Sequence, residues 1–114
     1  MTIEKIAELI DGKVICCGEK ISASVEYAFA SDLMSDVLTV EKENMVLITG
    51  LANLQTIRTA EMSDITCIIF ARDKKIGEEI ISLARENNMI LLESPHSLFH
   101  ISGVLYQAGV KSIY

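Results

Sequence analysis

The order of apolar and polar residues predicts helices and strands in alternation along the chain. Residues 3–10 carry Ile or Ala at positions 3, 6, 7 and 10, which is the spacing of one buried helical face. Thr2 can cap the start of this helix, and Gly12 can end it in a left-handed turn. A short strand is predicted at residues 13–17, and the loosely alternating residues 23–30 predict a second strand.

The second predicted strand leads into a short helix. One face of the strand is expected to carry Val25, Tyr27 and Phe29. Ser31 and Asp32 have side-chain oxygens that can accept hydrogen bonds from the first N–H groups of a helix. We therefore expect them to cap a helix over residues 33–39.

From residue 44 onward the same pattern occurs three times. An uninterrupted apolar run is followed each time by helical spacing, with runs at residues 45–48, 65–71 and 89–92 and helices at 52–62, 76–87 and 95–108. Ser94 is expected to cap the last helix, with Pro95 in its first position and Gly109 at its end.

These alternations predict the fold class. Runs that are apolar at every position indicate strands covered on both faces, as in parallel sheets, and short connections favour right-handed crossovers. We therefore predict a single α/β domain over residues 1–114, with a mostly parallel sheet and short strand–helix connections.

Composition and charge narrow the range of functions. The 114 residues are half apolar but include only three Tyr, three Phe and no Trp, so the core must be aliphatic. A net charge of −6 disfavours nucleic-acid and anionic membrane surfaces, which require clustered Lys and Arg. No apolar run approaches the length of about 20 residues that spans a bilayer, and the charged N-terminus lacks signal-peptide features. We expect a cytoplasmic protein.

The three cysteines do not predict a disulfide or a metal site. Cys16 and Cys17 are adjacent, and Cys67 leaves an odd number, so neither a disulfide framework nor a zinc-knuckle spacing is present. We expect all three thiols to be reduced, with Cys67 buried as a small apolar residue.

Candidate ligand-binding residues gather where the predicted strands end. Ligands of open parallel sheets bind beyond the carboxyl ends of the strands, and three turns fall there, at residues 49–53, 72–75 and 93–97. Each turn precedes a helix, whose first N–H groups and positive dipole end favour an anion or a nucleotide. The same residues are also ordinary turn and helix-start signals, so a purely structural role stays open. The candidate ligand-binding residues, including two after the second strand, are Ser31, Asp32, Thr49, Gly50, Asn53, Ser94, His96 and Ser97.

Signatures of metal binding and catalysis are missing from the sequence. His96 and His100 could share a helical face, but they lack the glutamate of a His-Glu-x-x-His zinc motif, and we expect no metal site. A phosphate loop, a dinucleotide fingerprint and a nucleophile elbow are also absent. Ser31 and Asp32 could take part in acid–base chemistry, although capping the next helix is their simpler role. We expect a protein that is not an enzyme and that needs no cofactor.

Residues 25–38 resemble a segment of the DRTGG domain family. Members of this family carry a Tyr-x-Ser-Asp-Leu-Leu-Ser segment there, which is matched by Phe29, Ser31, Asp32, Leu33, Met34 and Ser35. Residues 47–49, Leu-Ile-Thr, are similar to the family's Trp-Ile-Thr segment, and the later strands and helices follow the family's order. The resemblance therefore spans nearly the whole chain.

The resemblance implies a fold like that of the N-terminal domain of bacterial HPr kinase/phosphorylase. Relatives also occur beside CBS domains and in phosphotransacetylases as regulatory modules, which implies self-association and a sensory role without kinase activity. The namesake motif is degenerate, because residues 22–28 read Ser-Ala-Ser-Val-Glu-Tyr-Ala and lack the Asp-Arg pair and both glycines. This replacement puts in question any contact that relatives make through that turn.

Three functions stay open at this point. The first is a regulatory domain that forms a homodimer and binds a small ligand, such as an adenine nucleotide by analogy with the family. The second is a protein–protein interaction module without a ligand, and the third is a small enzyme that uses His96 or the pair Ser31 and Asp32. A ligand domain predicts a pocket at the strand ends, whereas an interaction module predicts a large exposed apolar patch. We expect a symmetric homodimer, because 50% apolar residues exceed what a small domain hides.

Overall fold

The three apolar runs form the centre of a six-stranded sheet in the computed structural model, which describes residues 1–114. The strands are β1 (Lys13–Cys16), β2 (Tyr27–Ala30), β3 (Met45–Thr49), β4 (Cys67–Phe70), β5 (Ile90–Glu93) and β6 (Lys111–Ser112). Their order across the sheet is β1-β5-β4-β3-β2-β6, and every pairing is parallel except the one between β1 and β5. The predicted α/β fold with a mostly parallel sheet is confirmed.

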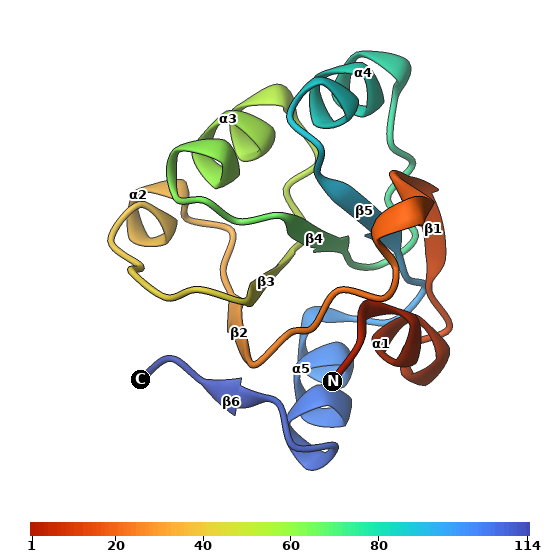
Figure 1. Cartoon of the computed structure of the whole chain (residues 1–114), viewed down its shortest axis with the longest axis vertical. Coiled ribbons are helices and arrows are strands. Elements are labelled where there is room, and N and C mark those ends of the chain that lie inside the picture. The colour runs from red at the N-terminus through yellow and green to blue at the C-terminus, as the bar shows by residue number, and fades with distance from the viewer.

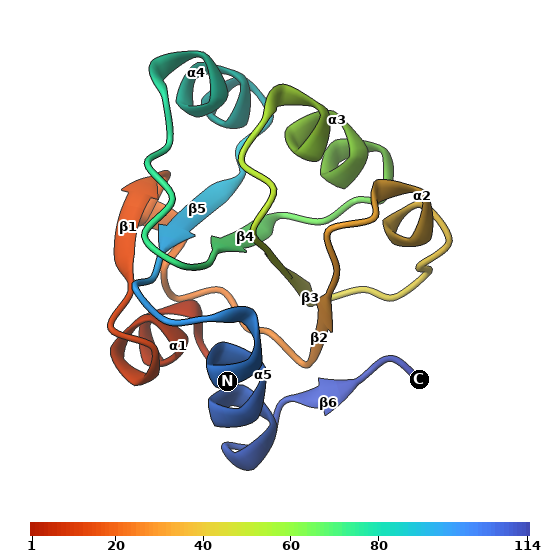
Figure 2. The same cartoon turned by 180° about the vertical axis from the view of Figure 1, so that it is seen from behind.

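Helices cover both faces of the sheet (Figure 1). They are α1 (Ile3–Leu9), α2 (Met34–Val37), α3 (Leu54–Met62), α4 (Glu78–Glu86) and α5 (Leu98–Gln107), with a 3₁₀ turn at Gly18–Lys20. In both views α2, α3 and α4 lie on one face, and α1 and α5 lie on the other (Figure 2). None of these helices has the length and apolar character that a membrane-spanning segment needs.

The core consists of two aliphatic clusters of 15 buried residues each, one on either face of the sheet. Val46 and Ile48 belong to the cluster beneath α1 and α5, whereas Met45 and Leu47 belong to the cluster beneath α2, α3 and α4. This alternation is what burial of a central strand on both faces requires, and it explains why β3 reads as an uninterrupted apolar run. Cys67 is buried as predicted, with 1% of its surface exposed.

Two predicted features near the N-terminus are wrong, because long-range contacts replace the local pattern. The second strand begins at Tyr27 rather than at residue 23. Val25 precedes the strand, and its N–H donates to the carbonyl of Met1 at 2.7 Å. The turn after α1 takes its left-handed conformation at Asp11, with φ 53°, and not at Gly12.

The start of the last helix also differs from the prediction. Ser94 and Pro95 lie in the turn before α5, and the cap is Ser97, whose side chain accepts a hydrogen bond from the N–H of His100. Gly109, with φ 105°, follows α5 as predicted. The strand β6 after it has no predicted counterpart, because two residues are too short to show a periodicity.

Candidate functional site

The carboxyl ends of four parallel strands meet at one edge of the sheet. β2, β3, β4 and β5 are neighbours with the same direction, so the turns that follow them lie side by side. We call this region the carboxyl edge; it comprises residues 31–32, 49–53, 71–75 and 93–97. All eight candidate residues from the sequence lie in these turns or at the strand ends before them.

Asp32 joins the first two turns of the carboxyl edge. Its Oδ1 accepts hydrogen bonds from Oγ1 of Thr49 at 2.8 Å and from the N–H of Gly50 at 2.7 Å. Thr49 is fully buried, and its Oγ1 accepts in turn from the N–H of Leu51. The predicted capping role of Asp32 is therefore wrong, since the cap position of α2 is Leu33, whose own side chain makes no capping hydrogen bond. Asp32 instead reaches across the sheet to the end of β3.

Arg72 lies over the second turn. A Cβ atom at Gly50 would lie 3.1 Å from an Nη atom of Arg72, so the absence of a side chain at Gly50 lets the guanidinium approach the backbone. Arg72 has a left-handed backbone with φ 62°, and its N–H donates to the carbonyl of His96 at 2.8 Å. Lys74 and Lys75 follow Arg72, so the turn after β4 is basic in a chain whose net charge is −6.

The turn at residues 93–97 is tied to the end of α1. The buried hydroxyl of Ser94 donates to the carbonyl of Ile10 at 2.7 Å and accepts from the N–H of His96 at 3.2 Å. Nε2 of His96 lies 2.8 Å from Oδ2 of Asp11. The rings of His96 and His100 are stacked with their centroids 4.1 Å apart. No group of three or more His, Cys, Asp or Glu side chains that could hold a metal ion is found in the chain.

The remaining three candidates have local roles. Asn53 caps α3 by accepting from the N–H of Thr56 at 2.9 Å, and Ser97 caps α5. Oγ of Ser31 accepts from the N–H of Leu33 at 3.0 Å. The turn at residues 72–75 is one of the predicted strand-end turns, but none of its basic residues is among the eight candidates, although Arg72 directly follows the apolar run at 65–71.

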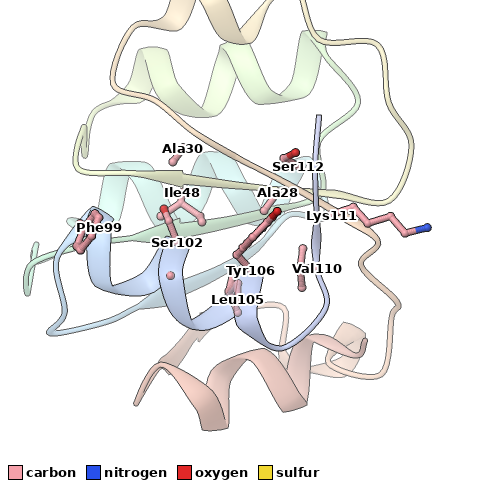
Figure 3. Close-up of a pocket in the computed structure, with 11 residues that line it drawn as sticks. Ala28, Ala30, Ile48, Phe99, Ser102, Leu105, Tyr106, Val110, Lys111 and Ser112 are labelled. Atoms are coloured by element: carbon pink, nitrogen blue, oxygen red, sulfur yellow. The ribbon is translucent and has the colours of Figure 1, made fainter. Parts of the chain in front are cut away.

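Four cavities are present, and none of the eight candidate residues lines any of them. The largest has about 690 Å³ and lies near the amino ends of the strands, beside residues 23–25 and 38–45. Another of about 330 Å³ lies between α5 and the strands β2 and β6 (Figure 3). The side chains of the carboxyl edge bond mainly to one another and to the backbone of neighbouring turns.

Two of the three cysteine thiols, Cys16 and Cys67, are poor nucleophiles at neutral pH. Cys16, Cys17 and Cys67 are free thiols, and the Sγ atoms of Cys16 and Cys17 are 3.1 Å apart. Burial raises the pKa of Cys16 to about 11 and the pKa of Cys67 to about 12. Both thiols therefore stay protonated at neutral pH, and a protonated thiol is a poor nucleophile.

Comparison with known protein families agrees with the resemblance found in the sequence. The model of the family described as the DRTGG domain matches residues 5–108. The chain belongs to the DRTGG domain family. A comparison with curated proteins gives no match.

The fold of this DRTGG domain is shared with a solved structure from Clostridium perfringens. That crystal structure contains the CBS and DRTGG domains of the regulatory region of a pyrophosphatase, complexed with the activator diadenosine tetraphosphate. The two structures agree with a TM-score of 0.72 at 17% sequence identity, over 94% of this chain and 46% of that chain. This DRTGG domain therefore spans less than half of the chain that it matches.

Proposed function

We propose that this DRTGG domain is a non-catalytic regulatory module that binds a small anionic ligand and associates with a second copy of itself. Family membership supports a regulatory role. The solved structure with the same fold belongs to a regulatory region and was complexed with a dinucleotide activator. For this chain the ligand class that we propose is an adenine nucleotide. The setting that we propose is the bacterial cytoplasm, where the thiols of the protein stay reduced.

The guanidinium of Arg72 carries the ligand proposal. It takes part in neither ion pair of the chain, Lys5–Glu8 or His96–Asp11, although Oδ2 of Asp32 also lies beside Gly50. The guanidinium lies beside the backbone of Gly50, in the turn that precedes the N-terminus of α3. A guanidinium next to the start of a helix favours a phosphate group, because both supply N–H donors and positive charge.

The other candidate residues take two roles in this proposal. Gly50 and Asn53 frame the phosphate next to Arg72, and the rim of the site comprises Ser31, His96 and Ser97. Asp32, Thr49 and Ser94 hold the turns in place through hydrogen bonds that the structure contains. No cofactor or metal ion is part of the proposed site.

A thermal-melt screen tests the ligand proposal. The panel consists of AMP, ADP, ATP, cyclic AMP and diadenosine tetraphosphate, each with and without Mg²⁺. A ligand at a hundredfold over its dissociation constant stabilises by about 2.7 kcal/mol and shifts the midpoint by about 10 °C in a domain of this size. The substitution Arg72→Gln should remove the shift, and Thr49→Val should reduce it.

Arg58→Gln is the matched control, because Arg58 is an exposed arginine of α3 that also has no ion pair. It should leave the ligand-induced shift unchanged. No shift for any nucleotide would contradict the ligand proposal. An equal loss of the shift in both arginine variants would mean that nucleotides bind only through general charge.

A specific observation favours a second function, that of an interaction module without a ligand. Phe99, Tyr106 and Tyr114 are 89%, 72% and 85% exposed, and Phe99 and Tyr106 line the same cavity beside α5. Exposed apolar side chains that gather at one place mark interaction surfaces. This function predicts association in solution together with no response to the nucleotide panel. Because both functions include association, the response to the nucleotide panel is the measurement that separates them.

A further inference from the structure

We propose that the groove between α5 and the strands β2 and β6 binds a second copy of this chain, with the two α5 helices packed antiparallel across Gly103. The proposal rests on the self-association in the proposed function and adds its surface and its geometry. It does not depend on the ligand site at the carboxyl edge.

The groove is apolar and open to solvent. It has a volume of about 330 Å³ (Figure 3). Its floor is formed by Ala28, Ala30 and Ile48, and α5 contributes Phe99 and Tyr106 to its wall. The groove is lined by no carboxylate, and its one charged lining residue is Lys111, whose side chain points away from it in Figure 3.

The helix α5 is apolar on two sides. Ile101 and Leu105 are fully buried against the sheet, as expected for a helix that covers it. Phe99, Gly103 and Tyr106 are spaced by four and three residues and therefore share the outer face. α5 contains no Asp, Glu, Lys or Arg, whereas α4 carries several charged residues. A helix that is apolar on both sides is typical of one that is buried in a larger assembly.

The charge distribution favours a second copy as the occupant. The chain has 16 acidic residues and a net charge of −6, but residues 94–114 contain no Asp or Glu. Two copies that met through an acidic surface, such as that of α4, would bring carboxylates together, which opposes association. The α5 groove is a surface that two identical acidic chains can share without this repulsion.

The edge of the sheet beside the groove is also incompletely paired. β6 pairs with β2 only at Tyr27 and Ala28, so the last two residues of β2 have no strand on that side. An open sheet edge next to exposed aromatic side chains is normally covered by another element. The second copy would cover both features at once.

The spacing of the aromatic residues fits a two-fold axis. Phe99 and Tyr106 lie equally far from the midpoint between Ser102 and Gly103. Antiparallel packing about this midpoint places Phe99 of each copy against Tyr106 of the partner subunit, which makes two identical aromatic contacts. A Cβ atom at Gly103 would meet nothing within 4 Å, so a second helix can approach the backbone closely there.

The oligomeric state of the full chain and of Gly103→Glu tests the proposal. A glycine inside a helix is destabilising, so glutamate at this open position should preserve the fold while placing a charge at the centre of the contact. Sedimentation equilibrium should show a dimer for the unaltered chain and a dissociation constant at least about 30-fold higher for the variant. Met62→Glu is the control, because Met62 is 70% exposed on α3, on the other face of the sheet. The dissociation constant of the Met62→Glu dimer should equal that of the unaltered chain.

A cross-linking experiment tests the two-fold geometry. Two copies of Gly103→Cys, treated with oxidised glutathione, should form one disulfide between them as the oxidant is reduced to two glutathione thiols. Gly77→Cys is the control, because a Cβ at Gly77 also meets nothing within 4 Å but the position precedes α4 on the opposite face. Its copies should remain uncrosslinked.

The outcomes separate this proposal from the proposed function. An unaltered chain that is monomeric at micromolar concentration overturns the groove and the self-association together, and leaves the nucleotide screen as an independent test. A dimer that survives Gly103→Glu, or that does not crosslink through Gly103→Cys, overturns the groove alone.

Discussion

The carboxyl edge and the α5 groove differ in what their side chains bond to. At the edge, Asp32, Ser94 and His96 have hydrogen-bond partners that are 17, 84 and 85 residues away along the chain. In the groove, Phe99 and Tyr106 are largely exposed to solvent. The edge residues therefore hold the fold together, whereas Phe99 and Tyr106 are dispensable for it. Stability and association should thus be separable by mutation.

Asp32→Ala should have the largest effect on the stability of the fold. It removes the acceptor from the buried hydroxyl of Thr49 and from the N–H of Gly50. Hydrogen bonds to a charged group and the penalty for a buried unpaired donor together predict a loss of about 3 kcal/mol in the free energy of unfolding. Urea unfolding at low protein concentration measures this loss.

Asp36→Ala is the matched control for this prediction. Asp36 is an exposed aspartate on α2, and its carboxylate makes no hydrogen bond. Its removal should leave the urea midpoint unchanged. Similar midpoints for the two variants would show that Asp32 is solvated and that the edge is not held by its carboxylate.

Ser94→Ala should have an intermediate effect. Its buried hydroxyl donates to the carbonyl of Ile10, and without it this carbonyl at the end of α1 loses its side-chain donor. The expected loss is about 2 kcal/mol, with faster amide hydrogen exchange in α1 than in α4. Ser102→Ala tests the same change in the groove. The Ser102 hydroxyl bonds only to the Leu98 carbonyl of its own helix, so its loss should be neutral.

The sequence predicted the central fold because two-sided burial requires a distinctive pattern. A strand such as β3, whose residues alternate between two core clusters, must be apolar at every position. The helices between the strands need one apolar face and therefore show a spacing of three and four residues. Both patterns are local, so the order from β3 to α5 could be predicted before any contact was known.

The roles of Asp32 and Ser94 could not be predicted, because their local signal is ambiguous. Side chains that cap helices can equally bond to a distant backbone, and the choice depends on which strands lie next to each other. Asp32 bonds to β3, and Ser94 bonds to the end of α1, so each departs from the predicted cap. The left-handed backbone at Arg72, with φ 62°, likewise follows from the hydrogen bond of its N–H to the carbonyl of His96, in the turn at residues 93–97.

The α5 groove was visible in the sequence only in part. The spacing of Leu98, Ile101, Leu105 and Ala108 predicts the inner face of the last helix. Ile101 and Leu105 are buried as predicted, whereas Ala108 at the end of the helix is exposed. Phe99 and Tyr106 form a second apolar stripe seven residues apart, which is weaker as a signal because single exposed aromatics are common. Only the exposed fractions and the cavity beside these residues show that the second stripe faces a groove.

His96→Ala should have the smallest effect on stability and the most informative effect on binding. Its contact with Asp11 joins side chains that are 31% and 73% exposed, so its loss should cost less than about 1 kcal/mol. His100→Ala, which removes the stacked ring without removing the Asp11 contact, is the control. A variant at His96 that keeps its urea midpoint but loses the nucleotide-induced melting shift would place the ligand at the carboxyl edge. A loss of stability as large as that of Ser94→Ala would instead show that the histidine ring anchors α1, and that the turn at residues 93–97 is wholly structural.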